Sequence, residues 1–200
     1  LFRSADAISI DLEDAVVEAR KSEARDIVAS WLKERKRGDS NKLVIVRVNA
    51  MDTLHFEEDI AAVVHSGIDI VNLPKPDSAE AVRATSELIA KAEKANGVTH
   101  SVRLLLNIET PKSLRQAVLL AKADARVMGL QVGLGDLFEP LGIDRRDVAA
   151  VQHLHDLAFD GRAKGAPAVV CPALTGFRVA GTDRSRMGVR SRTAVPVALP

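Results

Sequence analysis

Charged and amide side chains follow five short apolar runs of the sequence, each at the point where the run ends. They are Asp11, Glu13, Asp14, Arg47, Asn49, Asn72, Lys75, Asn107, Glu109 and Asp136. Parallel α/β proteins carry their active sites at the carboxyl ends of the strands. If the five runs are neighbouring strands of one sheet, these side chains converge on a single site.

Two of these residues, Glu109 and Asp136, are carboxylates without a cysteine or histidine nearby. Carboxylate oxygens, completed by water and substrate, are the usual ligands of Mg²⁺ and Mn²⁺. Gly133 and Gly135 flank Asp136 and would let the backbone approach a ligand closely. Arg47 offers a planar fork that suits a carboxylate. Metal and arginine together indicate a site for a small oxo-acid, in which the metal polarises a carbonyl oxygen.

Six apolar runs rich in β-branched residues are the candidate strands that would position these side chains. They span residues 7–12, 43–49, 68–74, 103–109, 127–133 and 167–172. Between most of them lie stretches with helical periodicity and helix start or stop signals, at 22–36, 55–66, 78–96, from Pro111 onward and at 144–164. This alternation predicts an α/β fold with a parallel sheet.

Six strands fit either an open doubly wound sheet or most of a (β/α)8 barrel, which typically needs about 250 residues. No GxGxxG or GxxxxGK[ST] segment follows a candidate strand, which counts against a nucleotide-binding sheet. We therefore predict an incomplete (β/α)8 TIM barrel, with about six strands, over residues 1–176. Residues 177–200, with five arginines and one aspartate, are expected to form a basic, irregular tail.

Composition narrows the classes of function further. The 200 residues hold 28 Lys and Arg against 27 Asp and Glu, so overall charge does not favour nucleic acid or a membrane surface. No apolar run approaches the ~20 residues of a membrane-spanning helix. The single cysteine, Cys171, excludes an internal disulfide, fits a reducing, cytoplasmic compartment and is expected to be a buried packing residue. Lys75 is expected to contact a substrate anion or to be a surface charge, rather than to form a Schiff base.

Several motifs follow one another in a recognisable order. They are Asp11–Val16 (DLEDAV), Lys21 with Ala24-Arg25, Arg47-Val48-Asn49, Leu73-Pro74-Lys75, Ile108-Glu109-Thr110 and Gly133–Leu137 (GLGDL). This set, which covers residues 5 to about 142, resembles the citrate lyase β-subunit-like proteins of the HpcH/HpaI aldolase superfamily.

The resemblance implies a (β/α)8 barrel of the phosphoenolpyruvate/pyruvate type that assembles into homotrimers or hexamers. It also implies Mg²⁺-dependent cleavage of a β-hydroxyacyl-CoA, such as citryl-CoA, malyl-CoA or citramalyl-CoA, into an acyl-CoA and a small oxo-acid. Glu109 and Asp136 would be the metal ligands, and Arg47 would bind the oxo-acid carboxylate. Glu13 and Asp14 would lie around metal and substrate. Family members begin with a further strand and close with an Ile-His-Pro strand, and we expect this chain to lack both ends.

Lys75 and Gly135 complete the residues expected to contact substrate. Other functions remain open at this point. One is a metal-dependent aldolase acting on a free hydroxy-oxo acid. Another is an inactive, incomplete barrel that serves only as an assembly subunit, because missing strands leave unpaired sheet edges. Nucleic-acid binding through the basic tail is the least favoured, since that tail has no aromatic residue beyond Phe177. We expect neither a nucleic-acid nor a membrane partner.

Overall fold

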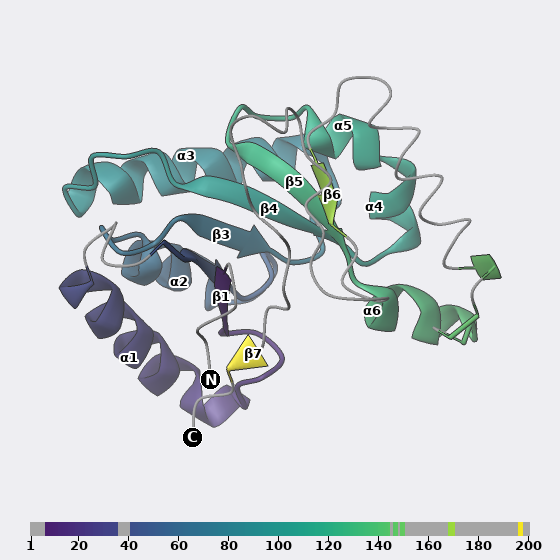
Figure 1. Ribbon diagram of the computed structural model, residues 1–200, viewed down its shortest axis with the longest axis horizontal. Coiled ribbons are helices and arrows are strands. Elements are labelled where there is room, and N and C mark those ends of the chain that lie inside the picture. Colours follow the sequence, from purple (N-terminus) through teal and green to yellow (C-terminus); the bar gives the residue numbers. More distant parts are fainter. Residues whose placement is uncertain are drawn as a thin grey trace.

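The computed structural model describes residues 7–35, 41–144, 146, 147, 149 and 150, and the backbone of two short strands at 168–170 and 196–197. Within this part of the chain, seven strands form one parallel sheet in the order β6-β5-β4-β3-β2-β1-β7 (Figure 1). The strands are β1 (Ala7–Asp11), β2 (Leu43–Arg47), β3 (Ile70–Leu73), β4 (Arg103–Ile108), β5 (Val127–Val132), β6 (Ala168–Val170) and β7 (Pro196–Val197).

Six helices connect the strands in the described ranges, and two of them begin at a side-chain cap. The six are α1 (Lys21–Glu34), α2 (Phe56–Val63), α3 (Ala79–Ala95), α4 (Pro111–Arg115), α5 (Ala117–Ala121) and α6 (Leu134–Phe138), with 3-10 turns at Glu18–Arg20 and Glu139–Leu141. At α3, the Ser78 hydroxyl accepts a hydrogen bond from the Ala81 amide at 3.2 Å. At α4, Thr110 and Ser113 form a reciprocal capping box around Pro111. No helix in the described ranges is long and apolar enough to cross a membrane.

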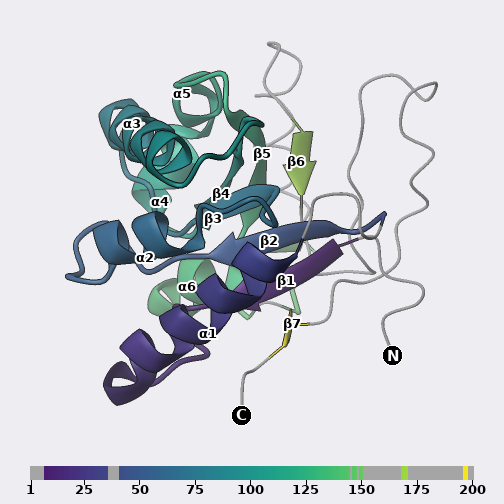
Figure 2. The ribbon, with the colours of Figure 1, turned by 90° about the vertical axis from the view of Figure 1, so that its left-hand side faces the viewer.

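The arrangement of strands and helices is that of a barrel wall. Strands β1 to β5 lie side by side in the order in which they occur in the chain. A doubly wound sheet would instead show a point at which this strand order reverses. Because βα crossovers are right-handed, an order without reversal puts every helix on the same face. Figure 2 shows α1, α2, α3 and α5 on one side of these strands. The predicted α/β fold of the barrel type is confirmed, as a partial barrel.

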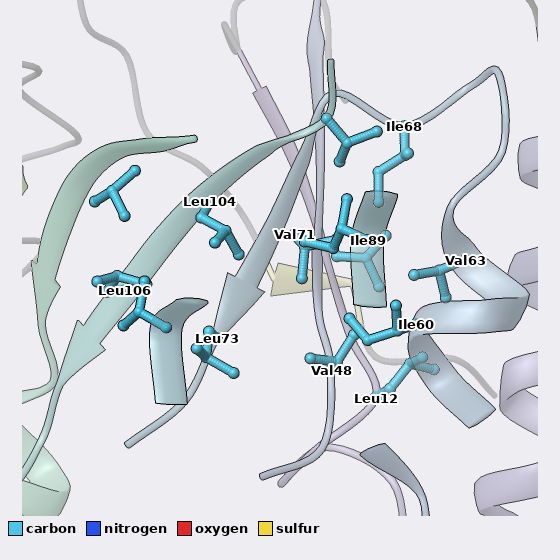
Figure 3. Packing of buried hydrophobic residues seen from close by; sticks show 14 of the residues in the cluster. Leu12, Val48, Ile60, Val63, Ile68, Val71, Leu73, Ile89, Leu104 and Leu106 are labelled. Atoms are coloured by element: carbon cyan, nitrogen blue, oxygen red, sulfur yellow. The ribbon is translucent and has the colours of Figure 1, made fainter. Parts of the chain in front are cut away.

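The main hydrophobic core lies between the sheet and its helices. Its largest fully buried side chains include Leu12, Ile60, Ile89, Leu104 and Leu106 (Figure 3). Side chains alternate between the two faces of a strand, so every second residue of β1, β2, β3 and β4 enters this core. The remaining residues point to the opposite, inner face.

The inner face changes character along the strands. Near its middle, Ile45, Ile70 and Leu105 form a small apolar cluster from β2, β3 and β4. Two residues further toward the carboxyl ends, the inner positions are polar, and Arg47 and Asn72 lie in register with each other. A layer of polar side chains therefore sits above an apolar layer, at the end of the sheet where the sequence predicts a site.

The six predicted strands are confirmed, with ends that shift by one or two residues. The helices predicted at 22–36, 55–66 and 78–96 are also confirmed. The helix expected from Pro111 is interrupted at Gln116, which separates α4 from α5. Cys171 and most of the helix predicted at 144–164 lie outside the described residues. Strand β7 lies in the segment expected to be irregular, and pairs with β1.

Candidate active site

Arg47, the last residue of β2, connects three carboxylates at the carboxyl end of the sheet. Its Nε and Nη2 donate to Asp11 Oδ1 and Oδ2 at 2.8 and 2.5 Å. Its Nη1 lies 2.7 Å from Glu13 Oε2 and 3.2 Å from Asp14 Oδ2. The fork that the sequence analysis reserved for a substrate carboxylate is thus directed at Asp11, and only Nη1 lies toward the predicted site residues Glu13 and Asp14.

Asp11 is expected at this end of the sheet, but the sequence alone assigns it no role in the site. It is in register with Arg47 on the adjacent strand, which brings the two side chains together on the inner face. Its carboxylate also accepts from the amides of Glu13 at 2.9 Å and Ala15 at 3.3 Å. An aspartate followed by such a turn is a recognisable local signal. Asp11 therefore shapes the turn that carries Glu13 and Asp14.

Glu109 lies at the end of β4 and is 5% exposed. Its Oε1 accepts from Asn107 Nδ2 at 3.0 Å, whereas its buried Oε2 has no hydrogen-bond partner in the described structure. A Cβ added to Gly133 would lie 2.5 Å from Oε1, so this glycine makes room for the carboxylate. Burial raises the pKa of Glu109, and the charge of Asp136 raises it further, while Arg47 and Lys75 lower it. The charges of Arg47, Lys75 and Asp136 therefore all act on the Glu109 carboxyl group.

Asp136, in the first turn of α6, is paired with Lys75. The two side chains approach at 2.6 Å between Nζ and Oδ2, and Nζ also lies 3.8 Å from Glu13 Oε1. Lys75 has a positive φ of 49°, the one such non-glycine residue among those described. Its hydrogen bond to Asp136 is the main reason that its pKa is raised. A Schiff-base lysine needs a lowered pKa, so the structure argues against that role.

Opposing effects act on the pKa of Glu13, which lies in the same site. The residue is 8% exposed, and burial raises its pKa to about 7 although the Arg47 and Lys75 charges act in the other direction. A carboxyl group of this kind exchanges its proton near neutral pH. Glu13 thus combines an ion pair with a proton that is easily gained or lost.

Four buried oxygen atoms at this end of the sheet have no hydrogen-bond partner in the described structure. They are Oε2 of Glu13, which is in an ion pair with Arg47 Nη1, Oδ1 of Asn72, Oδ1 of Asn107 and Oε2 of Glu109. Buried acceptors are normally paired, so an open set indicates a place for a cation or a hydrogen-bond donor. An all-oxygen set suits a hard ion such as Mg²⁺. No three His, Cys, Asp or Glu side chains in the described ranges are grouped to hold a metal, so water and substrate would have to complete the coordination of an ion at Glu109 and Asp136.

The other predicted site residues differ in how much the structure constrains them. Asp14 is at the rim, with a side chain 61% exposed. A Cβ added to Gly135 would meet no atom within 4 Å, so close packing does not require glycine there. Lys75 and Glu13 face each other across the site. All seven predicted positions are therefore at the carboxyl end of the sheet: Arg47 ends β2, and the other six lie on the connections after β1, β3, β4 and β5.

Comparison with known proteins gives consistent matches. The model of the family described as HpcH/HpaI aldolase/citrate lyase matches residues 2–169. The citrate lyase subunit beta of Escherichia coli strain K12 is 39% identical over 142 residues, which are 70% of this chain and 46% of that protein. The L-malyl-CoA/beta-methylmalyl-CoA lyase of Cereibacter sphaeroides is 25% identical over 162 residues, 80% of this chain and 50% of that protein. The chain thus spans about half the length of these relatives.

A solved structure supports the fold. The citrate lyase beta subunit of Mycobacterium tuberculosis, complexed with oxaloacetate and magnesium, superposes with a TM-score of 0.62 at 24% identity. The match covers 84% of this chain and 69% of that one. At this level of identity the likeness establishes the architecture of the sheet and helices.

Proposed function

The chain belongs to the HpcH/HpaI aldolase/citrate lyase family, and from this membership we propose that the protein is a Mg²⁺-dependent carbon–carbon lyase. Its substrate would be a β-hydroxyacyl-CoA of the citryl-CoA, malyl-CoA or citramalyl-CoA type, and its products an acyl-CoA and a small oxo-acid. The observation that carries the proposal is the buried Glu109 carboxylate, which has an unpartnered Oε2 and shares its site with Asp136. We place this activity in the cytoplasm and expect a homotrimer or hexamer.

Glu109 and Asp136 are the residues that would hold the metal. Both supply carboxylate oxygen, which suits Mg²⁺ and would also accept Mn²⁺. When bound, the ion acts as a Lewis acid that draws electron density from the carbonyl oxygen of the oxo-acid. The Gly133 backbone leaves the space that the Glu109 carboxylate occupies, so the position of this ligand is built into the β5–α6 connection.

Arg47 and Lys75 would bind the negative charge of the substrate. Asp11 holds Nε and Nη2 of Arg47, which fixes the guanidinium plane and leaves Nη1 on the side of Glu13 and Asp14. A carboxylate of the oxo-acid would take the place of the exposed Asp14 at Nη1. Lys75 would turn from Asp136 toward a substrate anion when that carboxylate binds an ion.

Cleavage requires a base for the β-hydroxyl group. The hydroxyl proton leaves, the carbon–carbon bond breaks to give the oxo-acid, and the acyl-CoA enolate takes up a proton. Glu13 is suited to hold the hydroxyl proton because burial raises its pKa to about 7. Arg47, which lies 2.7 Å from Glu13 Oε2, would stabilise negative charge on the oxo-acid during this step.

Calorimetry with the full chain tests the binding half of this proposal. Mg²⁺ is titrated alone and together with oxaloacetate, glyoxylate or pyruvate. We expect oxo-acid binding that requires Mg²⁺, and a loss of at least about 100-fold in Mg²⁺ affinity for Glu109→Gln, since one of only two protein carboxylates is removed. Glu57→Gln, a charge removal on the exposed surface of α2, is the matched control and should bind as the wild type does.

Product analysis separates the lyase from the alternatives. Incubation with malyl-CoA, citryl-CoA or a free hydroxy-oxo acid, each with Mg²⁺, identifies which compound is cleaved. Cleavage of the free acid alone would make the protein an aldolase. Mg²⁺-dependent oxo-acid binding without cleavage of any of them would favour the role of an assembly subunit. Turnover by Glu109→Gln that is still stimulated by Mg²⁺ would contradict the proposed metal site.

A further inference from the structure

Lys21, the first residue of α1, is a buried cation that the proposed reaction does not use. Only 9% of the residue is exposed. Its Nζ donates to the carbonyl oxygens of Leu12 at 2.8 Å and Glu13 at 2.6 Å, and to Asn49 Oδ1 at 2.6 Å. An ammonium group has three donors, and here each has an acceptor. The side chain is therefore fully engaged within the protein and has no N–H left for a substrate.

The third acceptor, Asn49, belongs to a longer buried network. Its backbone amide and Nδ2 donate to Asp59 Oδ2 at 2.9 and 2.7 Å. Asp59 Oδ1 in turn accepts from Arg25 Nε at 2.8 Å. Asp59 is 1% exposed and Asn49 3% exposed. Asp59 of α2 thus holds the Nδ2 group of Asn49, and Lys21 of α1 holds its Oδ1.

Stability alone does not account for a lysine at this position. Its three acceptors are two peptide carbonyls and one amide, which are neutral groups. An ammonium that is removed from water without a carboxylate in its hydrogen-bond shell loses much of its solvation energy. An apolar residue here would leave the three buried acceptors without this donor, so what the lysine adds is the set of hydrogen bonds to them.

The acceptors of Lys21 instead lie on two segments that carry site residues. Leu12 and Glu13 form the turn after β1, and the Glu13 side chain points into the site, where it meets Arg47. Asn49 follows Arg47 by two residues, at the end of β2. The ammonium therefore joins the backbone of the segment that carries Glu13 to a side chain of the segment that follows Arg47.

We propose that Lys21 is a positioning residue, which fixes the turn carrying Glu13 against the segment carrying Arg47 so that the two side chains meet the oxo-acid in one geometry. This role rests on the proposed function, because it assumes that Glu13 and Arg47 contact the substrate. Asn49, Asp59 and Arg25 support Lys21 by holding its amide acceptor in place. Lys21 itself touches no reacting atom.

The first experiment needs no ligand. Native-state hydrogen exchange is measured on the wild type, Lys21→Met and Lys33→Met, the last being a matched change on the exposed side of α1. We expect the amides of Glu13, Ala15 and Val16 to exchange at least about tenfold faster in Lys21→Met, while those of Leu105 and Leu106 in β4 are unchanged. Lys33→Met should leave both sets unchanged. Faster exchange by the same factor at every amide would mean a general loss of stability and would overturn the proposal.

The second experiment measures oxo-acid binding in the presence of saturating Mg²⁺. Loss of an outer contact that orients a site typically weakens it by about 10–100-fold, so we expect the Kd for oxaloacetate to rise by about tenfold or more in Lys21→Met. The Kd for Mg²⁺ alone should change less than about twofold, since Glu109 and Asp136 lie on other segments. A wild-type Kd for oxaloacetate in Lys21→Met overturns the positioning role. If the wild type binds no oxo-acid, the proposed function fails instead, and hydrogen exchange still decides whether Lys21 fixes the turn.

Asn49→Ala provides a second variant if Lys21→Met does not fold. It removes the amide acceptor but leaves both carbonyl acceptors of Lys21 in place. The same pattern is expected at smaller amplitude: faster exchange confined to the turn and a weaker Kd for oxaloacetate. An unchanged turn in Asn49→Ala would contradict the proposal.

Discussion

Glutamates at the two ends of the parallel sheet have pKa values that are shifted in opposite directions. At the amino end, Glu93 of α3 accepts from the Val102 amide at 2.7 Å and from Arg126 Nη1 and Nη2 at 2.6 and 2.7 Å. Burial raises its pKa, but the hydrogen bonds to Arg126 and Val102 outweigh burial, and the pKa is lowered. At the carboxyl end, burial prevails, and the pKa values of Glu13 and Glu109 are raised.

The difference lies in how completely each carboxylate is partnered. Both oxygens of Glu93 have donors within the chain, whereas Oε2 of Glu109 has none in the described structure. A completed network stabilises the fold, as expected for the amino end of a barrel, while incomplete networks belong to the end where substrates bind. The comparison indicates that the amino end is built for stability and that the carboxyl end gives up stability for binding.

The largest effect on stability is expected at the amino end. Glu93→Gln replaces a bidentate, charge-assisted pair by a neutral amide, which should lower the free energy of unfolding by about 2–3 kcal/mol at pH 7. Because the folded pKa of Glu93 is lowered, its contribution is present above the ordinary value of 4.5 and disappears as the pH falls through the folded value. Urea unfolding at pH 7 and pH 3 measures both quantities, and the difference between the two proteins should be smaller at pH 3.

Glu87→Gln is the matched control for this variant. Glu87 lies on the same helix but is exposed, so its replacement should change stability by less than about 0.5 kcal/mol. Equal losses in the two variants would remove the distinction between a partnered and a solvated glutamate on α3.

A smaller loss is expected where the carboxyl end is tightly packed. Gly133→Ala puts a Cβ against the Glu109 carboxylate, and overpacking of this kind costs about 1–2 kcal/mol. The φ of Gly133 is −91°, which alanine adopts freely, so the effect would be steric. Thermal unfolding measures the loss, and calorimetry should find weaker Mg²⁺ binding, because the displaced carboxylate is a proposed ligand.

Gly135→Ala tests whether the effect belongs to the close contact. An alanine Cβ at this neighbouring position meets no atom within 4 Å, so stability should be unchanged or slightly increased. If both variants lost the same stability, the cause would be the backbone of α6 and not the packing around Glu109.

The sequence predicts the positions of the strands better than the contacts between them. Apolar runs between helical stretches identify β1 to β6. In β2, β3 and β4 both the helix-facing side and the lower inner face are apolar, which makes these runs nearly continuous. The carboxyl ends follow directly from those runs, which is why Glu109 and Asp136 could be placed at one end of the sheet. The pairing of Asp11 with Arg47 depends on the register of β1 against β2, which no local pattern encodes.

The charged residues at the site illustrate the same limit. The sequence predicts that the guanidinium of Arg47 is available to a substrate, yet two of its nitrogens donate to Asp11. Lys21 stands at the start of an amphipathic helix, where a lysine normally points to solvent. It is buried here because three oxygen acceptors from distant segments surround it, and only the folded chain brings them together.

The smallest effect, opposite in sign, is expected for Glu13→Gln. The folded pKa of Glu13 is raised from 4.5 to about 7, so the protonated form is favoured in the folded state. The stability associated with that form is fully present below 4.5 and is lost as the pH rises through about 7. Glutamine keeps a neutral side chain at every pH. The variant should therefore match the wild type at pH 4 and become more stable than it at pH 8.

The size of this gain is limited by relaxation around the buried charge. A shift of this extent, which already includes the attraction of Arg47, corresponds to at most roughly 3 kcal/mol, and relaxation lowers the real cost of burying a charge, so we expect about 1 kcal/mol at pH 8. Urea unfolding across this pH range measures the difference, with Glu34→Gln, exposed on α1, as a control that should show no such trend. If Glu13→Gln were instead less stable than the wild type at pH 8, the ion pair would outweigh burial at Glu13 as it does at Glu93. Ion pairing would then prevail over burial at both ends of the sheet, and the ionised Glu13 would not lower the stability of the carboxyl end.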